Sequence, residues 1–124
     1  MGRFNFENPD VYQEAVEFAI RIYLITKNFP KKEWFGIVSQ LRRACISVPS
    51  NIAEGSSRTK KEFIRFLNIA LGSVYECVPL IEISKRQGFI DESSFDAFYA
   101  ELHRISAKIN ALKRSLTAPA KAHQ

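Results

Sequence analysis

Residues that build catalytic and metal sites are scarce in this chain. Its 124 residues include two histidines and two cysteines, and they contain no glycine-rich phosphate loop, nucleophile elbow or paired catalytic carboxylates. His103 and His123 stand far apart in the sequence, with no cysteine or aspartate at metal-ligand spacing. We therefore expect no enzymatic activity, no metal and no cofactor.

Glycine and long apolar runs are also scarce. The chain has only five glycines, which favours an all-α fold. No run of about 18 apolar residues is present to span a membrane, and the first residues lack the apolar segment of a signal peptide. We expect a cytoplasmic protein in which Cys45 and Cys77 are small buried hydrophobic residues. A disulfide or redox switch is the alternative.

Length and charge indicate one domain with an uneven surface. We expect residues 1–124 to form a single domain, ordered from about residue 8 to 116 and flexible at both ends. Residues 27–65 carry nine basic side chains against three acidic ones, although the whole chain has a net charge of only +5. This segregation favours an anionic partner, but a modest surplus also serves solubility.

Apolar residues recur at helical spacing in four segments. These segments span about residues 8–27, 32–55, 59–87 and 91–116. Their starts carry capping residues and their connections are short. The pattern predicts an antiparallel four-helix bundle.

Prolines interrupt the second and third segments. Pro49 removes a backbone donor and disfavours helical geometry at the preceding residue, so the second helix should kink or divide into two abutting helices. Ser47 or Ser50 would cap the restarted helix, and Gly55 would supply its C-terminal cap. Pro79 should bend the third helix.

The polar residues around Pro49 have two interpretations. Ser47, Ser50, Asn51 and Glu54 could form a ligand pocket. Alternatively, Asn51 and Glu54 could tie the kink to neighbouring backbone or to an arginine, and we favour this structural role.

The number of apolar seams differs between the segments. The fourth segment has one seam, in steps of three and four from Phe95 to Leu116, whereas the first and third have two each. In a monomer the second seams would be partly exposed, which favours a subunit interface. The alternative is that the proline kinks bury both seams within one chain. Gly72 in the third segment weakens a helix, and close approach of another helix would explain it.

Basic residues at the start of the third segment are candidates for nucleic-acid contacts. Arg58, Lys60, Lys61 and Arg65 gather where free amides and the helix dipole also favour anions. A solvated charged turn is the alternative.

Arg42 and Arg43 form a second candidate, because guanidinium groups match phosphate oxygens. Adjacent helical residues point about 100° apart, so both cannot face one phosphate squarely. We expect at least one of them to have a structural role instead, with one paired to Glu54 or Glu76 and the other solvated.

Two blocks of residues carry a family resemblance that spans roughly Phe6 to Leu116. The first block is Phe29-Pro30, Glu33, Gln40, Leu41-Arg42-Arg43-Ala44 and Ser47-Val48-Pro49-Ser50-Asn51-Ile52-Ala53-Glu54-Gly55, and the second is Arg58, Glu62-Phe63, Phe66-Leu67, Ala70, Gly72-Ser73 and Glu76. In this order they resemble the four helix bundle proteins, also called the 23S rRNA intervening-sequence protein family. Many relatives have a tryptophan in the first helix, where this chain has Val11-Tyr12-Gln13.

The resemblance implies an antiparallel four-helix protomer that assembles into a ring, typically a homopentamer. Relatives are encoded within sequences that interrupt bacterial large-subunit ribosomal RNA genes. The accessory variability determinants of diversity-generating retroelements are similar in fold and form pentamers that bind nucleic acid and a reverse transcriptase. The family brings no established enzymatic activity.

Three functional hypotheses follow. The first is a non-catalytic homo-oligomeric scaffold whose basic surface binds RNA, DNA or a nucleic-acid-processing protein. The second is a protein–protein interaction module whose charge serves only solubility. The third is an enzyme with a pocket at the Pro49 kink, where Asn51 and Glu54 would hold a ligand.

Overall fold

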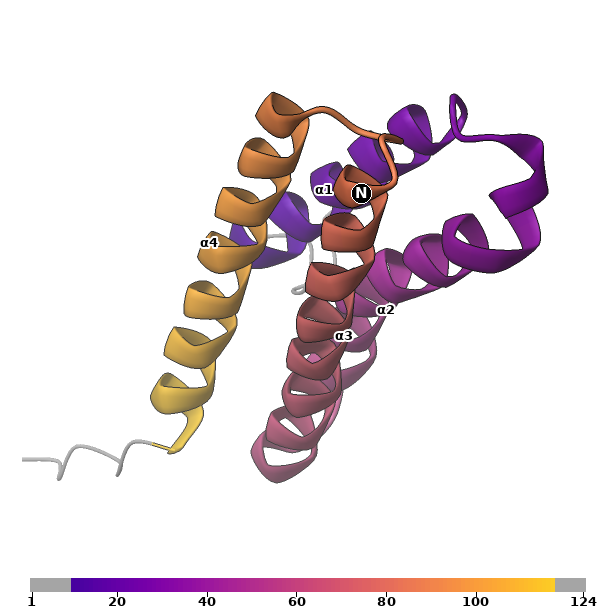
Figure 1. Ribbon diagram of the computed structural model, residues 1–124. Coiled ribbons are helices and arrows are strands. Elements are labelled where there is room, and N and C mark those ends of the chain that lie inside the picture. The colour runs from indigo at the N-terminus through magenta and orange to yellow at the C-terminus, as the bar shows by residue number, and fades with distance from the viewer. Residues whose placement is uncertain (1–9, 118–124) are drawn as a thin grey trace, which may run out of the picture.

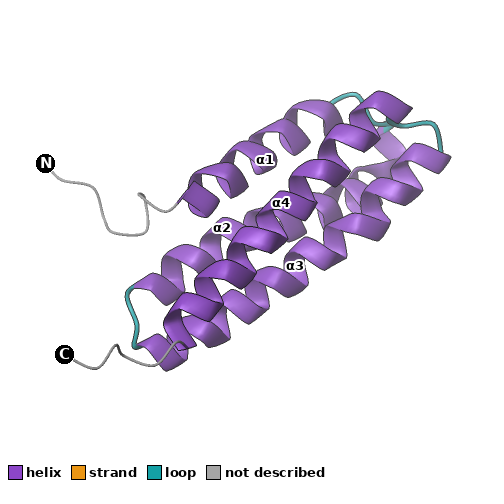
Figure 2. Cartoon of the chain, turned by 90° about the vertical axis from the view of Figure 1, so that its left-hand side faces the viewer, coloured by secondary structure: helices purple, strands orange, loops and turns teal. Residues whose placement is uncertain are grey.

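The computed structural model describes residues 10–117, which form four antiparallel α-helices (Figure 1). The helices are α1 (Asp10–Thr26), α2 (Ser39–Ser56), α3 (Lys60–Arg86) and α4 (Glu92–Thr117). Figure 2 shows that the α2–α3 turn lies at one end of the bundle and the other two connections at the opposite end. No strand occurs in residues 10–117, so the prediction of an all-α four-helix bundle is confirmed. The predicted helix start at Asn8 and most of the predicted flexible ends lie outside the described residues.

The main apolar seam of each helix contributes to one hydrophobic core. Helix α2 packs between α1 and α3, and α4 closes the bundle by packing against α3 and α1. Phe18 of α1 and Phe98 of α4 meet edge to face, with ring centroids 5.8 Å apart. Helix α3 is long and apolar enough to span a membrane by length and composition alone, but core helices share this property and its main seam is buried.

The connection between α1 and α2 is an irregular corner that stands out beside the other helices (Figure 1). It consists of a 3₁₀ turn, η2 (Lys31–Glu33), and a π turn, η3 (Trp34–Val38). Gly36 has φ −111° and ψ −108°, outside helical geometry. The prediction that the second helix begins near Lys32 is therefore wrong by about two turns, and the break in the helical path is at Gly36.

Helix α2 continues through Pro49 without a break. Cys45, Val48 and Ile52, on both sides of the proline, are buried in the core, and this packing holds the helix together despite the missing backbone donor. The alternative of two abutting helices is therefore wrong, and no restarted helix exists for Ser47 or Ser50 to cap. Pro79 likewise lies within a continuous α3.

Gly55 is a close-packing residue of α2, and its prediction as a C-terminal cap is wrong. It is buried within the helix, and among the described residues Gly88 alone has a positive φ, of 80°. A β-carbon at position 55 would lie 2.6 Å from the β-carbon of Phe66 and 2.9 Å from Cδ1 of Phe63. At Gly72, for which we expected such an approach, a β-carbon would have no neighbour within 4 Å among the described residues.

Thr59 caps the start of α3 and Asp91 caps the start of α4. The Glu62 amide donates to Thr59 Oγ1 over 3.2 Å at the start of α3, and the Ser94 amide donates to Asp91 Oδ1 over 2.7 Å at the start of α4. Because Gly88 adopts the left-handed backbone conformation, the chain can leave α3 and turn toward α4.

Candidate nucleic-acid interface

The six basic candidate residues are divided between the two ends of α2. Arg42 and Arg43 lie in its first turns, and four others follow its last turn: Arg58, Lys60, Lys61 and Arg65. An α-helix rises about 1.5 Å per residue, so the two groups lie roughly 20 Å apart along the helix axis. The structure therefore does not bring the six residues into one site.

Ion pairs neutralise half of the cluster at the α2–α3 turn. Arg58 pairs with Glu54 and lies 4.0 Å from a carboxylate oxygen of Glu62. Arg65 Nε lies 3.7 Å from the same carboxylate group. The interpretation that Glu54 pairs with an arginine is confirmed. Two cations of the cluster are exposed and have no acidic partner within residues 10–117: Lys60 and Lys61.

Phe66 supports both arginines of this cluster. Its ring centroid lies 5.4 Å from Cζ of Arg58 and 4.7 Å from Cζ of Arg65, within the range of cation–π attraction. Both side chains remain about half exposed, at 45% and 59%. The turn therefore presents two supported guanidinium groups beside two solvated lysines, which suits an extended anionic surface.

Arg42 anchors α2 to the last turn of α1. Its Nε donates to Thr26 Oγ1 over 3.0 Å and its Nη2 to the Tyr23 carbonyl over 3.3 Å. Its Cζ lies 4.4 Å from the Tyr23 ring centroid. The predicted pairing with Glu54 or Glu76 is wrong, because the carbonyl-rich end of α1 is nearer and attracts the cation.

Arg43 differs from its neighbour. Its side chain is exposed and makes no ion pair or hydrogen bond with any other described residue. The expectation that one of the two arginines has a structural role and the other is solvated is therefore confirmed, with Arg42 in the structural role and Arg43 solvated.

A cleft of about 720 Å³ lies beside both arginines, between the end of α1, η3, α2 and α3. Its walls include the aromatic rings of Trp34 and Phe35, the guanidinium groups and the Glu76 carboxylate. The sequence did not predict this cleft. The adjacent aromatic residues Trp34 and Phe35, about two helical turns before the basic pair, were the available signal, but they were assigned to a regular helix.

The polar residues near Pro49 link α2 to α3. The Asn51 side-chain amide donates to the Ser47 carbonyl over 2.8 Å and to Ser47 Oγ over 3.0 Å. The Ser73 hydroxyl of α3 donates to Ser47 Oγ over 2.7 Å. Asn51 thus has the predicted structural role, while Ser50 is exposed. Neither Asn51 nor Glu54 lines the cleft, so the pocket supposed for an enzyme at Pro49 is not formed by these residues.

An apolar groove of about 440 Å³ lies on α1 and α2 and shares Tyr23 and Ile46 with the cleft. Its most exposed large apolar side chains are Ile20 at 55%, Leu24 at 56% and Ile46 at 41%. On the α3–α4 side, Tyr75 and Tyr99 line another pocket, of about 380 Å³, and are 56% and 46% exposed. The second seams are therefore partly exposed, as expected for a single protomer.

The described residues contain no group of three or more histidine, cysteine, aspartate or glutamate side chains placed to hold a metal ion. His123 lies outside the described residues.

Comparisons with known proteins give one family and one fold. Residues 7–111 match the family model described as 23S rRNA-intervening sequence protein. No curated protein matches the chain. A crystal structure of a protein of unknown function from the S23 ribosomal protein family of Bacteroides thetaiotaomicron is similar, with a TM-score of 0.76 and 24% identity over 84% of this chain and 95% of that one. At this identity the likeness shows the fold.

Proposed function

Because the chain belongs to the 23S rRNA-intervening sequence protein family, we propose that it is a non-catalytic, homo-oligomeric helical scaffold of the bacterial cytoplasm whose basic surface binds RNA. The observation that carries this proposal is the exposure of the basic third of the chain. Of the nine lysine and arginine side chains in residues 27–65, all but Arg42 are exposed. Cations held at a surface release counterions from nucleic acid on binding, which drives association at low salt.

Two separate apolar surfaces support assembly into a ring. A ring forms when one surface of a protomer packs against a different surface of the next. The α1–α2 groove and the surface around Tyr75 and Tyr99 lie on different helix pairs, and both leave large apolar side chains in water. We propose that these surfaces pair around a homopentamer.

A ring would also strengthen weak nucleic-acid contacts. Within residues 10–117, only two basic side chains at the α2–α3 turn have no acidic partner, Lys60 and Lys61, so a single protomer would bind weakly. Repetition around the ring would present these lysines several times to one RNA. Binding of the second and later sites is then intramolecular, which raises overall affinity.

Charge reversal tests the proposal. We expect Lys60→Glu/Lys61→Glu to weaken binding of a short structured RNA by about ten-fold or more and to lower the salt dependence of binding. The control is Lys113→Glu/Arg114→Glu at the end of α4, which changes net charge equally. Fluorescence anisotropy across a salt series measures both. Salt-insensitive binding, or equal losses in the two variants, would contradict an interface at the α2–α3 turn.

The exposed apolar residues also support a second candidate, a protein–protein interaction module without a nucleic-acid role. Ile69, Ile83 and Tyr75 of α3 leave large apolar area in water. Capture of one defined partner from nuclease-treated lysate, together with failure to bind RNA at low salt, would favour this candidate.

A further inference from the structure

The cleft beside η3 contains aromatic rings that the fold does not use. Phe35 is 99% exposed and Trp34 is 44% exposed, so the Phe35 ring adds nothing to the core. Both project from the π turn in which Gly36 leaves helical geometry. π turns are rare and often occur at functional sites, and exposed aromatic side chains provide flat surfaces for stacking.

The same cleft contains fixed and solvated positive charge. Arg42 is held by its hydrogen bonds to Thr26 and Tyr23, so its guanidinium is positioned before any ligand arrives. Arg43 is exposed, and its charge is not offset by an ion pair with any residue the structure describes. Together they place cations beside the aromatic rings, in the combination that binds a base and its phosphate.

Acceptor groups complete the cleft. Glu76 of α3 is exposed and lines the cleft. A carboxylate repels phosphate, but it accepts hydrogen bonds from exocyclic amino groups of bases such as cytosine. The carboxylate and the guanidinium groups therefore suit two different ends of one nucleotide.

The chemistry of the cleft differs from that of the α1–α2 groove. The groove is lined by apolar side chains, with Lys27 as its charged member, and suits a second copy of the chain. The cleft has Arg43 and Glu76 among its walls, and an apolar partner face would leave these two charged side chains without partners. The charged cleft therefore favours an ionic ligand with a flat ring.

We propose that this cleft binds an unpaired nucleotide of single-stranded RNA. The base stacks on Trp34 and Phe35, Arg43 contacts a phosphate, and Glu76 accepts a hydrogen bond from the base edge. A base within a duplex is already stacked and paired, so it cannot enter the cleft. This inference rests on the proposed RNA-binding function and adds to it a second contact site, for an unpaired nucleotide.

The chain offers a direct probe, because Trp34 is its only tryptophan. We expect a cytidine-rich RNA of about five nucleotides to quench tryptophan emission to saturation at low salt, and a duplex of similar length to have little effect. Phe35→Ala should weaken binding by about ten-fold through loss of one stacking surface. Ile83→Ala, which removes an exposed apolar side chain of α3 outside the cleft, should bind as the parent does.

Two further variants separate the phosphate and base contacts. Arg43→Ala should weaken binding and lower its salt dependence, whereas Arg114→Ala, at an exposed position of α4, should not. Glu76→Gln should reduce the preference for cytidine over uridine oligonucleotides. Circular dichroism verifies that each variant is folded, which we expect because all these side chains are exposed.

Three outcomes would overturn the inference, and they are distinguishable. In the first, anisotropy shows RNA binding while Trp34 emission is unchanged and Phe35→Ala binds as the parent does. This result would contradict binding in the cleft and leave the proposed function at the α2–α3 turn. Absence of RNA binding at low salt would contradict both the nucleotide site in the cleft and the proposed RNA-binding function. A changed particle mass in Phe35→Ala, with RNA affinity unaltered, would identify the cleft as a contact between protomers.

Discussion

Gly55 of α2 packs directly against Phe66 of α3. A β-carbon at position 55 would lie 2.6 Å from the Phe66 β-carbon, an atom bonded directly to the backbone. Rotation of the Phe66 side chain cannot move that atom, so Gly55→Ala must push the helices apart. We predict a loss of about 1–3 kcal/mol in the free energy of unfolding, measured by urea denaturation.

Gly72→Ala is the matched control. It also replaces a helical glycine, but apart from its chain neighbours and the nearby backbone of α3, no atom of the described residues lies within 4 Å of the added methyl group. Because alanine favours the helix more than glycine does, we expect stability to rise by up to about 1 kcal/mol. Equal stability of Gly55→Ala and the parent would contradict the close packing of α2 on α3.

The two glycines show what the sequence could not reveal. Gly55 follows an apolar seam and precedes a polar stretch, which is also the pattern of a helix cap. Gly72 lies in the middle of a helix, where close packing is the usual explanation. Their roles depend on which face of each helix meets the other, and the position of Gly55 within α2 depends on where α2 ends.

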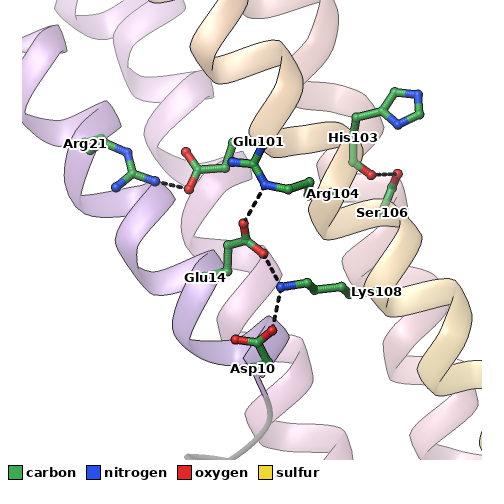
Figure 3. Close-up of polar contacts among 8 residues, drawn as sticks. All are labelled: Asp10, Glu14, Arg21, Glu101, His103, Arg104, Ser106 and Lys108. Atoms are coloured by element: carbon green, nitrogen blue, oxygen red, sulfur yellow. Dashed lines mark hydrogen bonds and ion pairs between the residues drawn. The ribbon is translucent and has the colours of Figure 1, made fainter.

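Arg21 of α1 and Glu101 of α4 form an ion pair across the bundle (Figure 3). Glu101 is 4% exposed, so its carboxylate depends on this partner. We predict that Arg21→Ala lowers the free energy of unfolding by about 1–3 kcal/mol, because a buried acceptor loses its charged donor. In a Glu101→Gln background the same substitution should cost less, and a double-mutant cycle measures the difference. Equal costs in both backgrounds would contradict the pair.

Glu14 of α1 receives two cations of α4, Arg104 and Lys108, at 3.1 Å and 2.9 Å (Figure 3). Burial raises the pKa of Glu14, but hydrogen bonds from Lys108 and Arg104 more than offset this and hold the pKa below its ordinary value. Hydrogen bonds to Asp10 and Glu14 raise the pKa of Lys108. Glu14 thus stabilises the fold above its unfolded-state pKa of about 4.3, and this contribution is lost as pH falls through the lowered folded value.

The Glu14→Gln variant tests these ion pairs between α1 and α4. At neutral pH we expect it to be less stable than the parent by about 1–2 kcal/mol, and the difference should shrink as the pH falls below about 4. Glu17→Gln, at an exposed position of the same helix, should change little. Urea unfolding across pH 3–8 measures both. A pH-independent difference between Glu14→Gln and the parent would contradict an ionic contribution.

The two cysteines are free and buried. Burial raises the pKa of Cys45 to about 12. Burial also raises the pKa of Cys77, and the nearby Cys45 and Glu76 raise it further. The thiolate is the reactive form, so we predict that a thiol reagent modifies neither residue in the folded protein at pH 8 and both after unfolding. Ser50→Cys, at an exposed position of α2, should react at once. Rapid modification of the folded parent would contradict the burial.

The candidate site was less predictable than the fold. Charge segregation correctly indicated exposed lysines at positions 60 and 61, because charged residues at a helix start are solvated unless paired. The partners of Arg42 could not be predicted, because Tyr23 and Thr26 approach it only when α1 and α2 pack. The cleft depends on the π turn around Gly36, and a period of 3.6 residues does not reveal such a turn.

The proposed function combines oligomeric assembly with RNA binding through the basic surface. The most direct test is light scattering after size exclusion, at low and high salt, with and without a short structured RNA. A homopentamer would have about five times the chain mass of 14.2 kDa, and we expect this mass to shift on adding RNA at low salt only. A 14.2 kDa monomer that RNA does not shift at any salt concentration would contradict it.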